Sequence, residues 1–132
     1  GEESTRQAVQ YWGVMAQECL DSAQRELAAD ALSFAVNRLY YAAFYVASAL
    51  LLERGSSFRK HSGVRAGFHR TFVKTGEIEV RWGRLYDRLF EGRQEADYLA
   101  LVSFERADVE VQLEECRQFL ERLRKLTRSG TT

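Results

Sequence analysis

The fold is decided by one stretch, Leu39-Tyr40-Tyr41-Ala42-Ala43-Phe44-Tyr45-Val46-Ala47-Ser48-Ala49-Leu50-Leu51-Leu52, in which a single serine is the only strongly polar residue. A transmembrane helix needs about 20 apolar residues, so this run is better explained as a helix buried inside a protein. A helix that is apolar on all sides needs neighbours on all sides. The stretch therefore predicts the central helix of an all-helical domain, entered through Asn37-Arg38.

Composition supports the same fold class. The chain has 132 residues, which is about the size of one domain. It contains no proline and only nine glycines. No window alternates apolar and polar residues with a period of two, so strands have no support. We predict an all-α fold, an antiparallel up-and-down four-helix bundle with one additional short helix. Residues 1–132 then form one domain, with a core over about 5–126 and a flexible tail over 129–132.

The helices can be placed from their apolar spacing and from capping residues. Asp30 is expected to cap the second helix and Ser103 the last one. A face with Phe34, Arg38, Tyr41 and Tyr45 is expected on the buried side of the second helix. The expected ranges are about 4–28, 31–52, 62–74, 79–100 and 104–128. Because the second helix is apolar beyond a single stripe, a second copy is expected to cover it as a homodimer.

Two further features bear on the environment of the chain. Cys19 and Cys116 are far apart in helical patterns, which favours free thiols in a reducing compartment. The segment from Gly1 to Arg6 is polar and does not resemble a secretory leader. We expect a cytoplasmic protein with no membrane association.

Charge is unevenly distributed, although it cancels over the whole chain. Residues 54–93 hold ten basic and four acidic side chains, whereas the flanking segments are both net acidic. A basic middle favours an anionic partner, and solvated helix faces explain it equally well.

Familiar enzyme motifs are absent. Neither His61 nor His69 follows a glutamate by three positions, which a di-iron bundle would require. There is no Walker loop, no Gly-x-Ser-x-Gly elbow and no Cys-x-x-Cys pair. We expect neither a metal nor a cofactor.

Charged residues instead occupy positions where the pattern calls for apolar ones. Arg93 and Asp97 continue the apolar face of the fourth helix, and Arg38 opens the buried second helix. A buried guanidinium needs an anion. Three interpretations stay open: a structural Arg38–Asp97 bridge, an ion pair between Arg93 and Asp97 along one helix, or a polar cleft that binds phosphate.

The cleft interpretation makes the most specific predictions. Guanidinium groups bind phosphate with paired hydrogen bonds, and tyrosine rings stack on bases. His61 is either a partly exposed polar residue or a general base, because a neutral imidazole beside cations can accept a proton near pH 7. The residues expected to bind nucleotide or phosphate are Arg38, Tyr41, Lys60, His61, Arg65, Arg93 and Tyr98.

Three sequence elements together resemble a small, stand-alone HEPN domain (higher eukaryotes and prokaryotes nucleotide-binding). They are Asn37-Arg38-Leu39-Tyr40-Tyr41-Ala42-Ala43-Phe44, Lys60-His61-Ser62-Gly63-Val64 with Phe68 and Phe72-Val73-Lys74-Thr75-Gly76, and Arg93-Gln94-Glu95-Ala96-Asp97-Tyr98. The resemblance covers about residues 5–126. It implies a dimer with the motif of the fourth helix in a cleft at the interface, and often a nucleotidyltransferase partner in a toxin–antitoxin pair.

Many HEPN proteins are metal-independent ribonucleases with an arginine followed, four to six residues later, by histidine. Arg93 matches the arginine, but no histidine follows it as far as Ala100. The first hypothesis is therefore a protein that binds nucleotide or RNA phosphate. The second is a helical scaffold without a ligand, and the third is a ribonuclease in which Arg93 acts with Asp97 or His61.

Overall fold

The computed structural model describes residues 1–98 and 103–127, and these residues are helical with short connections. The elements are α1 (Glu2–Ala28), α2 (Leu32–Glu53), α3 (His61–Phe68), the π-helical turn η1 (His69–Val73), α4 (Val80–Tyr98) and α5 (Arg106–Arg124). The predicted all-helical class is confirmed. The predicted tail over 129–132 and the predicted end of the fourth helix at Ala100 lie outside the described residues.

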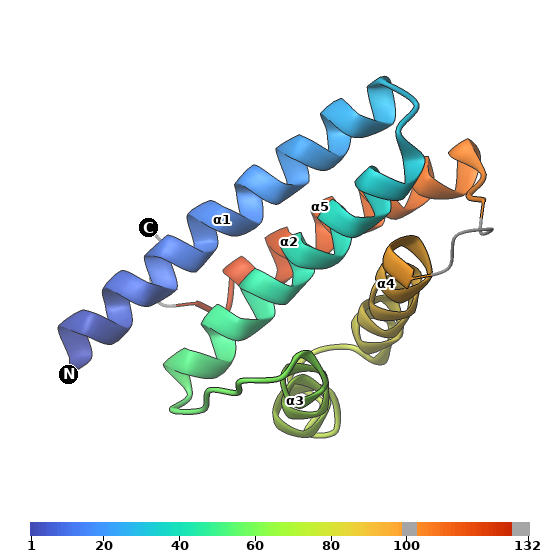
Figure 1. Ribbon diagram of the computed structural model, residues 1–132. Coiled ribbons are helices and arrows are strands. Elements are labelled where there is room, and N and C mark those ends of the chain that lie inside the picture. Colours follow the sequence, from blue (N-terminus) through green and yellow to red (C-terminus); the bar gives the residue numbers. More distant parts are fainter. Residues whose placement is uncertain (99–102, 128–132) are drawn as a thin grey trace.

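Helix α2 lies in the middle of the molecule and packs against α1, α3, α4 and α5 (Figure 1). Twelve of its residues are buried, from Ala35 to Leu51, so the apolar run is the centre of the core. By length and composition α2 could cross a membrane, yet 67% of its most apolar window is buried within the protein. This burial is typical of a core helix, as the sequence predicted.

The predicted buried face of α2 is wrong in its first half. Phe34 is 64% exposed and Arg38 is exposed, while Tyr41 and Tyr45 are half-buried. Periodicity cannot choose between the faces of a helix that is apolar all round, and here α1, α4 and α5 cover the other faces. Consequently Arg38 reaches solvent without needing a buried anion.

Two predicted caps are also wrong. Asp30 has a φ of 60° and lies in the turn that ends α1, and its carboxylate accepts a hydrogen bond from Arg106 Nη1 at 3.1 Å. Helix α2 therefore begins after Ala31, which provides no side-chain cap. Helix α5 begins at Arg106 with Glu105 at the cap position, so Ser103 lies before the helix.

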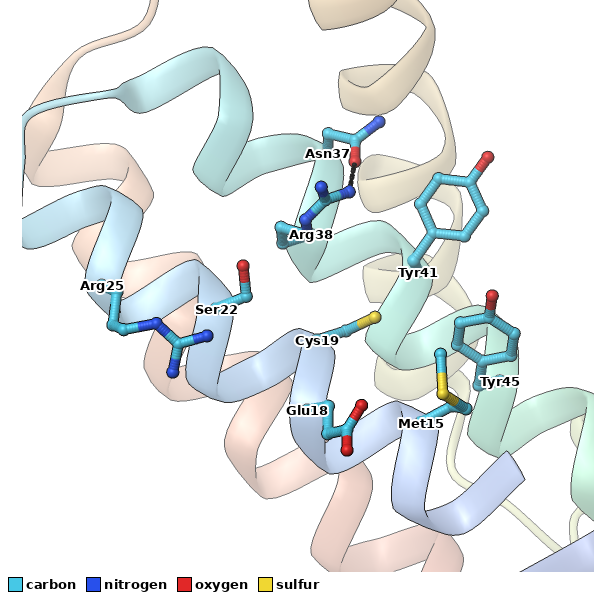
Figure 2. A pocket seen from close by; sticks show the side chains of 9 residues that line it. All are labelled: Met15, Glu18, Cys19, Ser22, Arg25, Asn37, Arg38, Tyr41 and Tyr45. Atoms are coloured by element: carbon cyan, nitrogen blue, oxygen red, sulfur yellow. Dashed lines mark hydrogen bonds between the residues drawn. The ribbon is translucent and has the colours of Figure 1, made fainter. Parts of the chain in front are cut away.

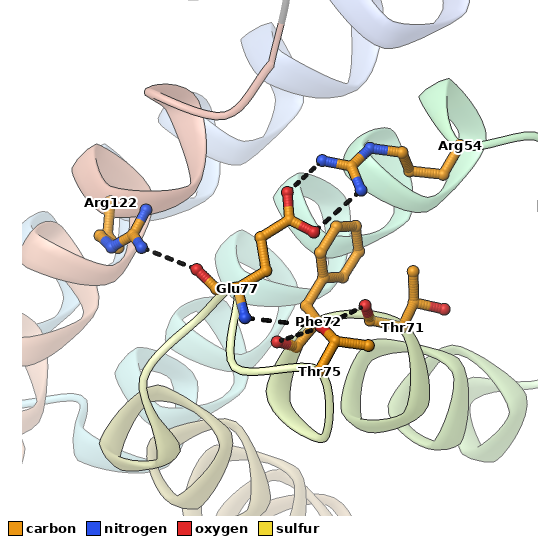
Figure 3. Close-up of polar contacts among 6 residues, drawn as sticks. All are labelled: Arg54, Thr71, Phe72, Thr75, Glu77 and Arg122. Atoms are coloured by element: carbon orange, nitrogen blue, oxygen red, sulfur yellow. Dashed lines mark hydrogen bonds and ion pairs between the residues drawn. The ribbon is translucent and has the colours of Figure 1, made fainter.

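The connection before α4 is fixed by polar contacts from two other helices (Figure 3). Arg54 at the end of α2 holds the Glu77 carboxylate with both terminal nitrogens, one of them at 3.0 Å. Arg122 of α5 donates to the Glu77 carbonyl at 3.0 Å and to Glu79 Oε1 at 2.8 Å. The hydrogen bond from Arg54 lowers the pKa of Glu77. These contacts set the position of α4, which carries Arg93.

Close packing between η1 and α4 requires a glycine. A Cβ at Gly83 would lie 2.8 Å from His69 Cε1 and 3.1 Å from Val73 Cγ2, whereas a Cβ at Gly13 would meet nothing within 4 Å. We expect Gly83→Ala to lower the free energy of unfolding by about 1–3 kcal/mol, because the His69 ring must move. Gly13→Ala, in the open middle of α1, should raise it by about 0.5–1 kcal/mol through helix propensity.

Urea unfolding followed by circular dichroism measures both changes. Equal effects of the two substitutions would show that the His69 contact with α4 is not tight.

Candidate functional site

Arg93 projects from the C-terminal half of α4 into a cage of aromatic rings. Its Cζ atom lies 5.4 Å from the ring centroid of Tyr40 and 5.7 Å from those of Tyr41 and Tyr98. Its side chain is only 13% exposed. Tyrosine faces attract a cation at such distances. The rings therefore hold the guanidinium in one place while leaving its N–H groups to other partners.

Arg93 uses few of those N–H groups within residues 1–98 and 103–127. Its Nη2 donates to the Tyr41 hydroxyl at 3.3 Å. Its Nε lies 3.1 Å from Asp97 Oδ2, but the N–H group is not directed at the carboxylate and makes no hydrogen bond. A guanidinium carries five N–H donors. Within the described residues only Nη2 makes a hydrogen bond, and the Nε atom is buried without a hydrogen-bond partner.

Asp97 is held by Asn37 and not by Arg38. Asn37 Nδ2 donates to Asp97 Oδ1 at 3.0 Å, and Asn37 Oδ1 accepts from Arg38 Nη1 at 2.8 Å. The expected Arg38–Asp97 bridge is therefore not formed, because Arg38 lies on the exposed side of α2 and the amide of Asn37 comes between them. The ion pair formed along the helix is the one between Arg93 and Asp97.

His61, the first residue of α3, lies against the same tyrosines as Arg93. Its ring is 5.7 Å from the centroids of Tyr40 and Tyr41, and it stacks on Phe44 at 4.4 Å. Burial, and then the positive charge of Arg93, lower the pKa of His61 below its usual value of 6.5. The imidazole is consequently neutral at pH 7.

The phenol of Tyr40 fixes one side of the imidazole. Tyr40 Oη is 2.6 Å from His61 Nδ1, and burial raises the pKa of Tyr40 to about 12. The phenol therefore stays protonated near pH 7. If Tyr40 donates to Nδ1, then His61 Nε2 carries the proton and donates to a ligand. If Nδ1 carries the proton, Nε2 is an acceptor and can act as a base.

Other predicted site residues are placed less closely. Lys60 is exposed at the start of α3. Arg65 pairs with Asp87 through its Nε at 2.8 Å and lies over Phe90. Tyr98 is 70% exposed, so it forms the open side of the Arg93 cage. The structure thus brings together Arg93, Asp97, His61, Tyr41 and Tyr98, whereas the guanidinium of Arg65 is held by another carboxylate.

The sequence interpretation missed three residues that organise these contacts. Asn37 and Tyr40 belong to the predicted second helix and to its HEPN-like element but were given no role in the site, although Asn37 is a polar residue just before the apolar run. His69, which was considered from the sequence as a metal ligand, is half-buried, with Nε2 2.9 Å from Asp87 Oδ1. In residues 1–98 and 103–127 no group of three or more His, Cys, Asp or Glu side chains is placed to hold a metal ion.

Comparison with known proteins matches this chain to a family and to several relatives. The family model of the HEPN domain matches residues 9–126. A "UPF0332 protein" of Thermotoga maritima is 48% identical over 89% of this chain and 89% of its own length. A protein of Methanocaldococcus jannaschii named "Putative toxin MJ0142" is 33% identical over 83% of this chain and 75% of its own length. A second one, "Putative toxin MJ0605", is 37% identical over 69% of this chain and 67% of its own length.

Proposed function

Since the chain belongs to the HEPN family, whose model covers most of it, we propose that it binds RNA by a backbone phosphate placed on Arg93. The supporting observation is the state of Arg93. It is a nearly buried guanidinium, oriented by three tyrosine rings, and it has one hydrogen bond within the described residues. Phosphate oxygens are the acceptors that best match such a fork of donors.

The neighbours of Arg93 suit the same ligand. The exposed ring of Tyr98 offers a face on which a base can stack. In the tautomer with hydrogen on Nε2, His61 adds a second donor at the edge of the cage. Asp97 carries the only negative charge in contact with Arg93 within residues 1–98 and 103–127, and Asn37 holds it on the α2 side. A phosphate can therefore approach Arg93 from the side of Tyr41 and His61.

A titration of single-stranded RNA against wild type and Arg93→Gln tests the proposal. Salt-sensitive binding that is lost in the variant supports it. Equal binding by both proteins contradicts it, and no binding by wild type at low salt would favour the helical scaffold. AMP and ATP, titrated in parallel, distinguish nucleotide binding from RNA binding.

A second candidate is metal-independent cleavage of the bound RNA, and the position of His61 beside Arg93 favours it. With Nε2 as acceptor, His61 takes the proton of a 2′-hydroxyl, the oxygen attacks the adjacent phosphorus, and the 5′-oxygen leaves with a proton from water. Arg93 would stabilise the charge that develops on the phosphate. RNA that is cleaved in the presence of a chelator by wild type, but not by His61→Gln, supports this candidate.

We also propose that two copies of the chain form a dimer around the site. This dimer presents the surface to which the partner in a toxin–antitoxin system binds. Phe34 is 64% exposed and lies three residues before Asn37, which contacts Asp97 beside the site. Exposed aromatic side chains of this kind are typical of interfaces. Two relatives are named as putative toxins, which supports an antitoxin as the further partner. That this antitoxin is a nucleotidyltransferase is what the HEPN resemblance suggests.

Light scattering after size-exclusion chromatography measures this assembly. We expect a dimer for wild type and at least about tenfold weaker self-association for Phe34→Glu, since a charge would be buried in the interface. Val111→Glu, at a 60% exposed position of α5, serves as the control and should stay dimeric. A monomeric wild type would contradict the proposal. Co-elution of a co-expressed nucleotidyltransferase tests the second partner.

A further inference from the structure

A groove lies between α1 and α2 (Figure 2), and it shares Tyr41 with the Arg93 site. Its volume is about 660 Å³, which is within the usual range for ligand sites. Helix α1 contributes polar and sulfur-containing side chains, and helix α2 contributes polar and aromatic ones. The lining residues are Met15, Glu18, Cys19, Ser22 and Arg25 of α1, with Asn37, Arg38, Tyr41 and Tyr45 of α2.

The side chains that line the groove carry more positive than negative charge. Arg25 and Arg38 line it, against the single carboxylate of Glu18. Within residues 1–98 and 103–127, neither arginine forms an ion pair, and the hydrogen bond of Arg38 goes to the neutral amide of Asn37. Burial raises the pKa of the Cys19 thiol, and the charge of Arg38 opposes that rise, so Arg38 acts electrostatically on the groove wall.

A chain of polar contacts joins the groove to the Arg93 site. Arg38 donates to Asn37, Asn37 donates to Asp97, and Asp97 Oδ2 lies 3.1 Å from Arg93 Nε. Tyr41 belongs to both places, because it lines the groove and accepts the hydrogen bond from Arg93. The two arginines are thus linked through Asn37 and Asp97, and the groove continues the site.

The chemistry of the groove matches a strand of nucleotides better than a single one. Single-stranded RNA is bound by cations that follow its phosphates and by aromatic rings that stack on its bases. The groove supplies Arg38 and Arg25 for phosphates, and Tyr41 and Tyr45 for bases. A mononucleotide whose phosphate sits on Arg93 would leave Arg25, Arg38 and Tyr45 unused.

We propose that the groove between α1 and α2 binds the nucleotides adjacent to the one held at Arg93, so that the ligand is single-stranded RNA several nucleotides long. This inference rests on the function proposed for Arg93. It adds a second binding region, with Arg38 and Arg25 as its phosphate contacts.

Cys19 provides a direct readout, because it lines the groove and is half-buried, whereas Cys116 is 0% exposed. In the folded protein a maleimide reagent should modify Cys19 and leave Cys116 unmodified, and the reaction is run at alkaline pH because the thiolate is the reactive form and the pKa of Cys19 is raised. The probes are a 2′-O-methylated hexauridylate, which cannot be cleaved through its 2′-oxygen, and UMP. We expect the hexanucleotide to slow modification of Cys19 at least about fivefold and UMP to leave the rate nearly unchanged.

Binding constants of groove variants provide the second readout. Arg38→Gln and Arg25→Gln should each weaken binding of the hexanucleotide about tenfold, because each removes one charge-assisted phosphate contact. Neither substitution should change the binding of UMP. Arg84→Gln is the matched control, since Arg84 is an exposed arginine of α4 that does not line the groove. We expect Arg84→Gln to weaken hexanucleotide binding less than twofold, and this change measures the general effect of removing one positive charge.

The outcomes separate this inference from the function on which it rests. In one outcome, hexanucleotide binding needs Arg93 but does not protect Cys19 and does not depend on Arg38 and Arg25. This outcome overturns the proposal that RNA binds in the groove and leaves the Arg93 site standing. Absence of binding by wild type overturns both. Modification of Cys19 that slows with rising protein concentration, without RNA, assigns the groove to a second copy of the chain and also overturns the inference.

Discussion

Replacing Arg93 by glutamine is expected to weaken binding of single-stranded RNA about 100-fold, the loss of two charge-assisted hydrogen bonds to phosphate. The side chain is 13% exposed and already oriented by the rings of Tyr40, Tyr41 and Tyr98, so the wild type spends little entropy in ordering it. Glutamine has a neutral amide and cannot reproduce the fork of donors. Fluorescence anisotropy of a labelled hexanucleotide measures the change.

Two further variants show whether the effect is specific. Arg93→Lys keeps the charge but loses the planar fork, and should fall between wild type and Arg93→Gln. Arg84→Gln changes the same charge at an exposed position of the same helix and should stay close to wild type. Thermal unfolding of each variant controls for the fold. If Arg84→Gln weakened RNA binding as much as Arg93→Gln, the binding would reflect general charge and not the Arg93 cage.

Replacing Phe68 by alanine is expected to lower the free energy of unfolding by about 3–5 kcal/mol, the usual cost of a cavity left by a buried aromatic ring. Phe68 is 0% exposed, stacks on Tyr86 at 5.4 Å and lies 5.7 Å from Phe119. It therefore joins α3 to α4 and α5. Because small domains are stable by only about 5–15 kcal/mol, the variant should be close to unfolding at moderate temperature.

Tyr11→Ala is the control for this substitution, since Tyr11 is an aromatic residue that is 59% exposed on α1. Its effect should be within about 0.5 kcal/mol. Chemical denaturation of the three proteins measures the difference. A cost below about 1 kcal/mol for Phe68→Ala would show that the packing of α3 against α4 and α5 contributes little to stability.

The sequence was sufficient for the helical fold class and for most of the core. Most of the apolar run of α2 is buried as predicted, and so is the apolar face of α4 that precedes Arg93. These predictions succeed because they depend on local periodicity and on the need to bury apolar surface. The helix ends were less predictable, since the Asp30 carboxylate accepts a hydrogen bond from Arg106, which is far away in sequence.

The site was predictable in its residues but not in its contacts. Arg93, Asp97 and His61 could be selected because charged or titratable residues interrupt an apolar pattern. Their partners could not, since the Asn37–Asp97 and Tyr40–His61 hydrogen bonds join helices that the pattern treats separately. The exposure of Arg38 was missed for a related reason, because the orientation of an apolar helix is set by its neighbours.

The titration of His61 also affects stability. Its pKa is lowered in the folded protein, so its neutral form is favoured there. The unfolded chain, with a histidine pKa of about 6.5, binds the proton more readily as pH falls. His61 therefore contributes stability that is present above about pH 6.5 and is lost as pH falls from there through the lowered pKa of the folded state. A bound phosphate beside the ring would oppose this loss.

The most direct test is an NMR titration of the His61 imidazole in the wild-type protein, free and with the 2′-O-methylated hexanucleotide bound. Burial and Arg93 should keep the pKa of His61 below its ordinary value in the free protein. If the phosphate sits on Arg93, its negative charge should raise the pKa of His61 in the complex, and RNA binding should tighten as pH falls through that range. Tight RNA binding that leaves the pKa of His61 unchanged would contradict a phosphate site at Arg93.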